Sequence, residues 1–460
     1  MQSIFRAMRK PDFIKGIGVY IFAWVIYMIT PEGMDEAAKR QIFIFVVAAL
    51  YWAMEIIPLY ATSLMVVLLE MFMLCRPDGV LAMSKTGYQV FLLPFGSPII
   101  MLFFGGFILA RAMHKYHIDK WIASNLLKVF GHKPYMILFG FMVATALLSM
   151  WMSNTATTAM MMAMVIPLLK QLDQKDPYRI GLVLAIPFAA NIGGIGTPVG
   201  TPPNAIAIGI LADQGIQVNF LSWMKMAVPL AMGMLILISA LLYVMYPPVK
   251  RQLQFSIQAS DIGQPKSIVA GVIALLTIIL WLTSGVHHIP SAMVALMSAG
   301  VFAATGILDR DDFKLIDWDV LVLMWGGLAM GKGLELTGLT KWIVDLPLFD
   351  QQGFVLVAVF CILAIVLSTF MSNTATANLI IPIVMAIPGE NPILMATTIA
   401  LSCSFAMALP ISTPPNAIAF ASNMIKSRHM LLSGSIVSVI SLLMVLLGYR
   451  FIITKALGLE

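Results

Sequence analysis

Apolar stretches with few charges alternate with short polar connections along almost the whole chain. As a helix, an apolar stretch of about 15 to 22 residues spans much of the apolar thickness of a bilayer. The pattern therefore predicts helical spans. The uninterrupted ones lie at residues 16–30, 42–57, 61–75, 98–112, 227–246, 268–283, 291–305 and 432–453.

Two longer apolar stretches are interrupted near their centres by polar residues. Residues 134–170 contain Ser-Asn-Thr at 153–155, and residues 354–388 contain the same three residues at 372–374. At about 1.5 Å per residue, each stretch is too long for one crossing and too short for two crossings with a loop. We therefore expect two re-entrant helical hairpins with their tips near the middle of the membrane.

Two more apolar stretches, residues 179–212 and 393–421, contain glycine or proline near their centres. Proline lacks the backbone donor and glycine weakens a helix, so both interrupt the hydrogen bonding of a span. We expect each span to break at its middle. Broken backbone at membrane depth is tolerated where it is buried in protein or lines a wet cavity, and transporters build their binding sites there.

The polar interruptions occur in matched pairs. Residues 152–157 and 371–376 both read Met-Ser-Asn-Thr-Ala-Thr, and residues 201–207 and 413–419 both read Thr-Pro-Pro-Asn-Ala-Ile-Ala. Counted from the serine to the threonine, the two motifs are 48 residues apart in one copy and 41 in the other. Two identities in the same order indicate an internal duplication.

Each copy of the duplication contains five predicted crossings, which is an odd number. In the second copy one of these is the passage with Met-Trp-Gly-Gly at 324–327, which matches Phe-Phe-Gly-Gly at 103–106 in the first copy. The second copy must therefore enter the membrane from the opposite side, and the two copies form an inverted repeat. The predicted division is an interfacial segment and first span at 1–38, a first repeat at 39–246, a cytoplasmic linker at 247–266 and a second repeat at 267–460. The predicted fold class is an all-α polytopic membrane protein with about eleven transmembrane helices and two re-entrant hairpins.

The composition supports a membrane protein and excludes a soluble globular chain. Hydrophobic residues make up 60% of the 460 residues and charged residues 11%, with a mean hydropathy of +0.93. The formal charge of +6 and the isoelectric point near 9.1 do not indicate nucleic-acid binding, because the basic residues form no cluster. With a cytoplasmic N-terminus, about 19 of the 28 lysines and arginines fall on the cytoplasmic side, which favours that orientation.

The three cysteines and six histidines show no disulfide or metal-binding spacing. Cys75, Cys361 and Cys403 lie in apolar surroundings, so we expect buried thiols. The histidines fall in connecting or interfacial stretches, which argues against a zinc site and against a histidine proton relay.

The four motifs supply hydroxyls, amides and free carbonyls, and none contains a lysine, an arginine or a carboxylate. Neutral oxygen ligands suit a hard cation such as Na⁺ better than zinc or copper. Half-helix amino termini and bound cations favour an anion between them. We therefore expect two symmetry-related Na⁺ sites and an anion balanced by Na⁺ and helix dipoles, so that cation and anion travel together.

Other interpretations of these residues stay open. Ser, Thr and Ala are common where membrane helices pack, although packing does not explain motifs kept in duplicate. A proton-coupled carrier needs a titratable group near the tips, and Glu55 and Glu70 lie in other spans. A passive anion channel is the competing class. An enzyme is not expected, because Ser153 and Ser372 have no nearby His or Asp to activate them for hydrolysis.

Paired Ser-Asn-Thr hairpin tips, each followed by a broken span with Thr-Pro-Pro-Asn, resemble the divalent anion/sodium symporter family and its bacterial INDY-type dicarboxylate carriers. The resemblance covers nearly the whole chain. It implies a homodimer in the bacterial cytoplasmic (inner) membrane, with a scaffold domain and a transport domain that moves as an elevator. The scaffold would contain the first to fourth and seventh to ninth spans, and the transport domain the two hairpins and the fifth, sixth, tenth and eleventh spans. It also implies Na⁺-coupled symport of C4 dicarboxylates such as succinate, fumarate and malate into the cell. Na⁺-independent dicarboxylate exchange and sulfate or citrate symport stay open within the family.

The resemblance carries the family's binding residues onto this chain by motif position. The first Na⁺ site falls on Ser149, Ser153, Asn154 and Gly200. The second falls on Ser368, the backbone of Met371, Asn373 and Ser412. The substrate is expected on Asn154, Thr155, Thr201, Pro202, Asn373, Thr374, Thr413 and Pro414. Ser412 stands where relatives often have a small apolar residue, and it is expected to offer its carbonyl.

Overall fold

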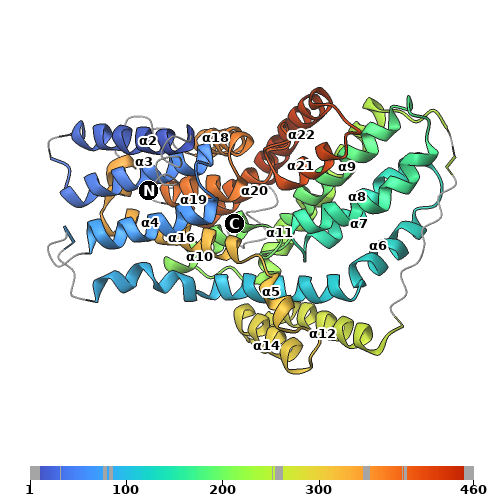
Figure 1. Cartoon of the computed structure of the whole chain (residues 1–460), viewed down its shortest axis with the longest axis horizontal. Coiled ribbons are helices and arrows are strands. Elements are labelled where there is room, and N and C mark those ends of the chain that lie inside the picture. Colours follow the sequence, from blue (N-terminus) through green and yellow to red (C-terminus); the bar gives the residue numbers. More distant parts are fainter. Residues whose placement is uncertain are drawn as a thin grey trace, which may run out of the picture.

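The structure is a computed structural model that describes residues 11–449 except 32, 76–79, 82–85, 251, 254–262, 345–352, 386 and 388–390. All regular structure in these residues is helical, as Figure 1 shows, which confirms the predicted all-α class. Residues 1–10 of the predicted interfacial segment and half of the predicted linker lie outside the described residues.

The helices follow one another without any strand in the described part of the chain. Those of the first half are α2 (Pro11–Met28), α3 (Glu36–Met54), α4 (Leu59–Leu74), the 3-10 helices η1 (Gly87–Phe91) and η2 (Leu93–Gly96), α5 (Pro98–Lys115), α6 (Ile118–Val129), α7 (Pro134–Ser149), α8 (Asn154–Gln171), α9 (Tyr178–Gly194), α10 (Pro202–Asp213) and α11 (Phe220–Met245). Those of the second half are α12 (Pro265–Leu282), α13 (Ser284–His287), α14 (Ser291–Ala304), α15 (Arg310–Lys314), α16 (Trp318–Leu336), α17 (Leu339–Val344), α18 (Phe354–Phe370), α19 (Asn373–Val384), α20 (Pro392–Cys403), α21 (Pro414–Ala421) and α22 (Ser427–Gly448).

Five of the described helices, α3, α5, α11, α12 and α22, are long and apolar enough to cross a membrane. Shorter apolar helices of 10–17 residues include α7, α9, α18, α19 and α20. Re-entrant turns and mid-membrane breaks produce helices shorter than a full span, as α10, α19 and α20 are, with 12 residues each. The number of eleven spans and the inverted repeat stay predictions.

Each polar interruption of the sequence lies between two helices. α7 and α8 pack side by side and meet at residues 150–153, and α18 and α19 do the same at residues 371–372. Residues 195–201 separate α9 from α10, and residues 404–413 separate α20 from α21. Both α10 and α21 begin at a proline. The first N–H groups of a helix have no partner within it, so a proline there costs no helical hydrogen bond.

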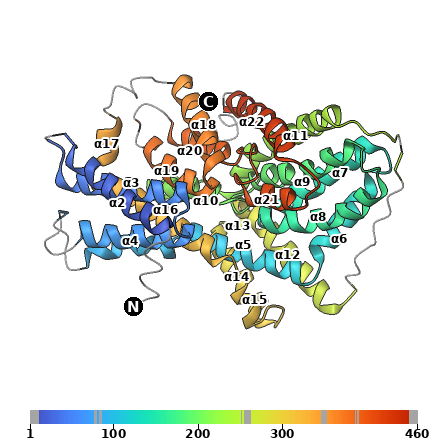
Figure 2. The same ribbon diagram turned by 45° about the horizontal axis from the view of Figure 1, so that its top comes forward.

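The interrupted helices form the centre of the molecule, and helices of the two halves lie side by side there. α10 packs against α19 and α20, and α21 packs against α8 and α9 (Figure 2). Every residue of α9 from Gly181 to Gly194 is buried. The broken backbone that the sequence predicts is therefore enclosed by protein, where its free polar groups find partners.

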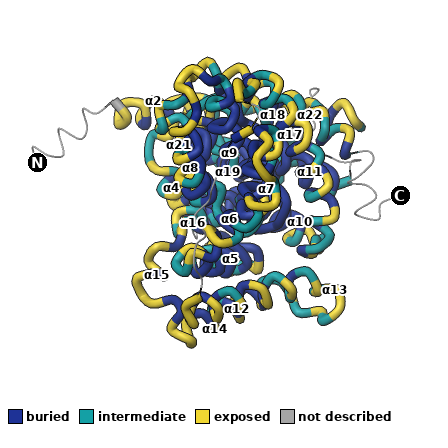
Figure 3. Tube along the Cα trace, turned by 90° about the vertical axis from the view of Figure 1, so that its right-hand side faces the viewer, coloured by how far each residue is buried: buried dark blue, intermediate teal, exposed yellow. Residues whose placement is uncertain are grey.

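The outermost helices expose apolar side chains. α12 and α14 pack on the outer side of α5, and exposed residues follow their free faces in Figure 3. Leu275 on α12, Met297 on α14 and Trp24 on α2 are each more than half exposed. Large exposed apolar faces are unusual on a soluble protein, whereas they suit contact with lipid.

Candidate functional site

The two hairpin tips begin their second helices in the same way. At the start of α8, Ser153 Oγ accepts a hydrogen bond from Ala156 N at 3.3 Å. At the start of α19, Ser372 Oγ accepts from Ala375 N at 3.1 Å. Each serine satisfies one of the free N–H groups at a helix start. Each tip thus presents a helix amino terminus, which carries partial positive charge.

A buried serine joins each tip to the interrupted helix beside it. Ser149 Oγ donates to Ala190 O at 2.8 Å and lies 2.6 Å from the amide of Asn154. Ser368 Oγ donates to Cys403 O at 2.7 Å and lies 2.6 Å from the amide of the second tip's asparagine. The same pair of contacts therefore fixes both asparagines.

Several oxygens converge on the first tip. One end of the Asn154 amide lies 2.6 Å from Ser149 Oγ, 3.2 Å from Ala190 O and 3.3 Å from Gly200 O. The Ser149 hydroxyl has one proton, and both Ala190 O and the Asn154 amide oxygen lie within hydrogen-bond distance of it. With its NH₂ group turned to these oxygens instead, Asn154 donates to all three. In either orientation the surrounding groups are oxygens, which favour a hydrogen-bond donor or a cation at this position.

The asparagine of each Thr-Pro-Pro-Asn motif holds the broken backbone in place. The Nδ2 atom of Asn204 contacts three carbonyl oxygens of the first break, at 3.1, 3.3 and 2.8 Å, and these belong to Gly194, Ile195 and Thr197. The Nδ2 atom of Asn416 contacts two carbonyl oxygens of the second break, at 3.2 and 3.0 Å, and these belong to Met407 and Leu409. Both amides thus satisfy carbonyls that lost their helical donors.

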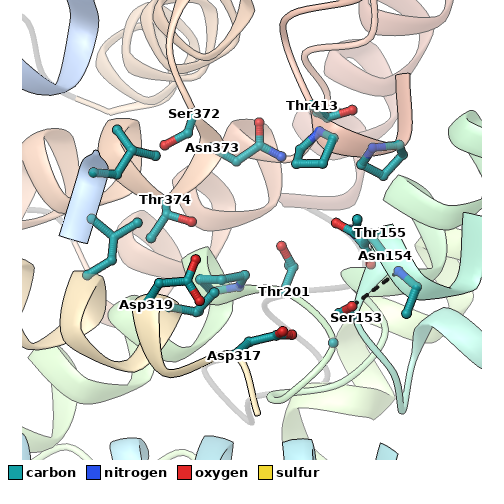
Figure 4. A pocket seen from close by; sticks show the side chains of 18 of the residues that line it. Ser153, Asn154, Thr155, Thr201, Asp317, Asp319, Ser372, Asn373, Thr374 and Thr413 are labelled. Carbon is teal, nitrogen blue, oxygen red and sulfur yellow. Dashed lines mark hydrogen bonds between the residues drawn. The ribbon is translucent and has the colours of Figure 1, made fainter. Parts of the chain in front are cut away.

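A cavity of about 670 Å³ lies where the tips and breaks of both halves meet (Figure 4). All eight residues predicted to bind substrate line it: Asn154, Thr155, Thr201, Pro202, Asn373, Thr374, Thr413 and Pro414. Five of the predicted Na⁺ ligands also line it: Ser153, Asn154, Gly200, Asn373 and Ser412. The other three, Ser149, Ser368 and Met371, are buried and do not line the cavity.

Several residues of this cavity were not predicted from the sequence. Asp317 and Asp319, at the start of α16, bring two carboxylates, which Figure 4 shows on the side away from Ser372 and Thr413. Two acidic residues at the start of an otherwise apolar stretch were the sequence feature that could have predicted them. The other missed residues include Pro58 before α4, Tyr60 of α4, Phe103 and Phe107 of α5, and Asn191 of α9. The aromatic ones carried no signal, because aromatic residues occur throughout the chain.

A smaller cavity of about 130 Å³ extends from the main one toward the end of α5. Four of its lining residues also line the main cavity, namely Phe107, Ser153, Ala156 and Asp317. It adds Arg111 and His114 of α5. The main cavity therefore extends toward a cation-bearing end of the molecule.

Ion pairs link this end of α5 to α15. Arg111 Nη2 lies 2.9 Å from Asp312 Oδ1, and Lys115 Nζ lies 3.1 Å from Asp309 Oδ2 and also pairs with Asp312. The backbone N–H of Asp312 and the Lys115 ammonium lower the pKa of the Asp309 carboxyl to about 2. The basic groups beside the smaller cavity are thus partly neutralised.

A family model described as "Sodium:sulfate symporter transmembrane region" matches residues 14–454. This match covers nearly the whole chain. The chain belongs to the divalent anion/sodium symporter family. The predicted resemblance is thereby confirmed, and this family member is a membrane transporter rather than an enzyme.

Curated relatives cover the chain almost completely. Two proteins named "Sodium-dependent dicarboxylate transporter SdcS" are each 30% identical to it. The one from Staphylococcus saprophyticus covers 96% of this chain and 92% of its own. The match to the one from Staphylococcus aureus (strain USA300) covers 99% of this chain and 95% of that protein. An "Uncharacterized transporter" of Haemophilus influenzae is 31% identical over 94% of this chain and 95% of its own.

Solved structures resemble the fold at low sequence identity. The Alcanivorax borkumensis YdaH transporter has a TM-score of 0.56 and 14% identity, covering 84% of this chain and 90% of its own. Neisseria gonorrhoeae MtrF has a TM-score of 0.54 and 12% identity, and the match covers 94% of this chain and 96% of MtrF. At such identities the likeness concerns the fold alone.

Proposed function

We propose that this family member is a secondary active transporter that carries C4 dicarboxylates, such as succinate, fumarate and malate, into the cell together with Na⁺. One observation carries the proposal. The cavity receives two matched sets of neutral donors, and no lysine or arginine is among its described lining residues. A dianion there must be balanced by helix amino termini and by cations that travel with it. The SdcS relatives, named sodium-dependent dicarboxylate transporters, support the same ion and substrate class.

The first Na⁺ would be held by Ser149, Ser153, Asn154 and the backbone of Gly200. The convergence of Ser149 Oγ, Ala190 O and Gly200 O on the Asn154 amide supports this assignment, since neutral oxygens are suitable ligands for a hard cation. With Na⁺ bound, the amide oxygen would face the ion.

The second Na⁺ would be held by Ser368, the backbone of Met371, Asn373 and Ser412. Ser412 Oγ donates to Thr369 O at 2.9 Å, so the side chain is engaged and the carbonyl is the group it would offer to the ion. This supports the prediction that a serine here replaces a small apolar residue without loss of the site.

The substrate would bind between the tips through Asn154, Thr155, Thr201 and Pro202 at one end and Asn373, Thr374, Thr413 and Pro414 at the other. One donor set for each end suits a molecule with two separated carboxylates. A compact tetrahedral anion such as sulfate would reach only one set well. Each hydrogen bond to a charged group left unmade costs about 1.5 to 3 kcal/mol, or roughly one to two powers of ten in affinity.

The transport step would be an elevator movement within a homodimer in the bacterial inner membrane, with the N-terminus in the cytoplasm. In support, the cavity is lined both by the predicted scaffold, through α4, α5 and α16, and by the predicted transport domain, through α8, α10, α19 and α21. A substrate held at such a boundary can be carried by one domain past the other.

Uptake of radiolabelled succinate into proteoliposomes tests the proposal. We expect saturable uptake that requires external Na⁺ and rises steeply with its concentration. Equal uptake in choline and Na⁺ media, stimulated by internal dicarboxylate, would identify a Na⁺-independent exchanger instead. Flux without saturation would identify a channel. Sulfate or citrate competing as well as succinate would overturn the C4 dicarboxylate assignment.

A further inference from the structure

Asn191 lines the cavity although it belongs to none of the four motifs. It lies near the end of α9, and its side chain is fully buried. Its Nδ2 atom donates a hydrogen bond to Thr413 Oγ1 at 3.2 Å. A residue of the first half of the chain therefore holds the first residue of the second half's Thr-Pro-Pro-Asn motif.

The hydroxyl of Thr413 accepts a second hydrogen bond as well. Asn416 N donates to Thr413 Oγ1 at 3.3 Å, which caps the start of α21. A hydroxyl oxygen accepts two hydrogen bonds and donates one. With both acceptor positions filled, the proton of this hydroxyl is left to donate, and Thr413 lines the cavity. A bound carboxylate accepts hydrogen bonds, so this orientation of Thr413 suits an anion.

The other half of the site lacks this arrangement. Thr201, which matches Thr413, makes no side-chain capping bond to the start of α10. Ser149 donates to Ala190 O in one half and Ser368 donates to Cys403 O in the other, so Ala190 and Cys403 occupy equivalent positions. The residues that follow them, Asn191 and Ser404, are therefore counterparts. The buried hydroxyl of Ser404 has no hydrogen-bond partner among the described residues, and Ser404 is not one of the residues that line the cavity.

We propose that Asn191 is a positioning residue for anion binding, which fixes the Thr413 hydroxyl as a donor toward one end of the substrate. The inference rests on the proposed function, because it assumes that the cavity binds a carboxylate at Thr413. It makes the two ends of the site unequal. The Thr413 end is oriented before the anion arrives, and the Thr201 end is not.

Succinate kinetics of Asn191→Ala in proteoliposomes test the proposal. Without its second partner the Thr413 hydroxyl is free to turn away, so the KM for succinate should rise about tenfold while the maximal rate stays within about twofold. Asn191→Ser, which is too short to reach Thr413, should behave the same way. Ser404→Ala is the matched control and should keep the wild-type KM. A general packing defect would instead lower the maximal rate and the amount of folded protein.

Two backgrounds at Thr413 show whether Asn191 acts through the hydroxyl. In Thr413→Val, which has no hydroxyl, Asn191→Ala should raise the KM by less than about twofold. In Thr413→Ser, which keeps the hydroxyl, the increase of about tenfold should remain. Size-exclusion profiles of all variants should match that of the wild type.

Opposite results would overturn the inference. A wild-type KM in both Asn191 variants, or an undiminished effect in the Thr413→Val background, shows that Asn191 does not act through this hydroxyl while the proposed function stands. A wild-type protein that carries no dicarboxylate fails the proposed function itself, and the inference falls with it.

Discussion

The two halves of the cavity share their local chemistry and differ in what surrounds it. Both tips start a helix with a serine cap and fix an asparagine amide with a buried serine. The halves differ at the breaks. Asn204 contacts three free carbonyls and Asn416 contacts two, while only the second half has a threonine held by an asparagine from the other half. The identical Met-Ser-Asn-Thr motifs therefore form the same local bonds at both tips, whereas the identical Thr-Pro-Pro-Asn motifs do not, since Thr413 caps α21 and Thr201 makes no such bond to α10.

The largest expected effect tests what the halves share. Asn154→Ala and Asn373→Ala should each reduce succinate uptake about 100-fold or more, because each amide is expected to contact both a cation and the anion. Uptake assays with equal amounts of folded protein measure this. A variant with near-normal uptake would show that its half of the site is not used.

Stability measurements test the first difference between the halves. Asn204→Ala and Asn416→Ala each remove a buried donor from carbonyls, which should cost about 1 to 3 kcal/mol of folding free energy, with the larger loss at Asn204. Melting temperatures of the purified variants in detergent give the order. Asn125→Ala, which loses two exposed hydrogen bonds, one to Trp121 O and one from Lys128 Nζ, is the control. An equal loss at both sites would mean that the third carbonyl contact contributes nothing.

Removing the charge of either carboxylate at the start of α16 should have a smaller effect, and it should improve succinate binding rather than weaken it. Asp317 and Asp319 line only one side of the cavity and repel a dianion, so Asp317→Asn or Asp319→Asn should lower the KM for succinate about threefold at saturating Na⁺. Asp319→Glu keeps the charge and should change the KM little. A raised KM in the amide variants would indicate that these carboxylates help to bind a cation instead.

The smallest effect concerns the exposed pair beside the smaller cavity. Asp309 is exposed. Hydrogen bonds from the backbone of Asp312 and from Lys115 favour its ionised form in the folded protein and lower its pKa from 3.8 to about 2. Its stabilising contribution is therefore complete above about pH 5 and is lost as the pH falls toward 2. The difference in melting temperature between wild type and Asp309→Asn should be constant from about pH 5 to 7 and shrink below about pH 4. A constant difference at every pH would exclude this linkage.

The sequence by itself determined the helical class, the membrane setting, the family and the motifs that line the cavity. These follow from local causes. Apolar length and composition decide where a chain meets lipid, and proline, glycine and capping serines decide where its helices stop. The Ser153 and Ser372 caps and the α10 and α21 starts lie where these rules put them.

The tertiary structure alone decided which distant residues complete the site. Asn191 and Thr413 are 222 residues apart, and nothing in the sequence of either half indicates that they touch. Asp317 and Asp319 enter the cavity because α16 packs beside the second hairpin, not because of any motif. The serine caps recur at both hairpin tips because they are local to the motif. The packing of helices from both halves decides what each copy faces.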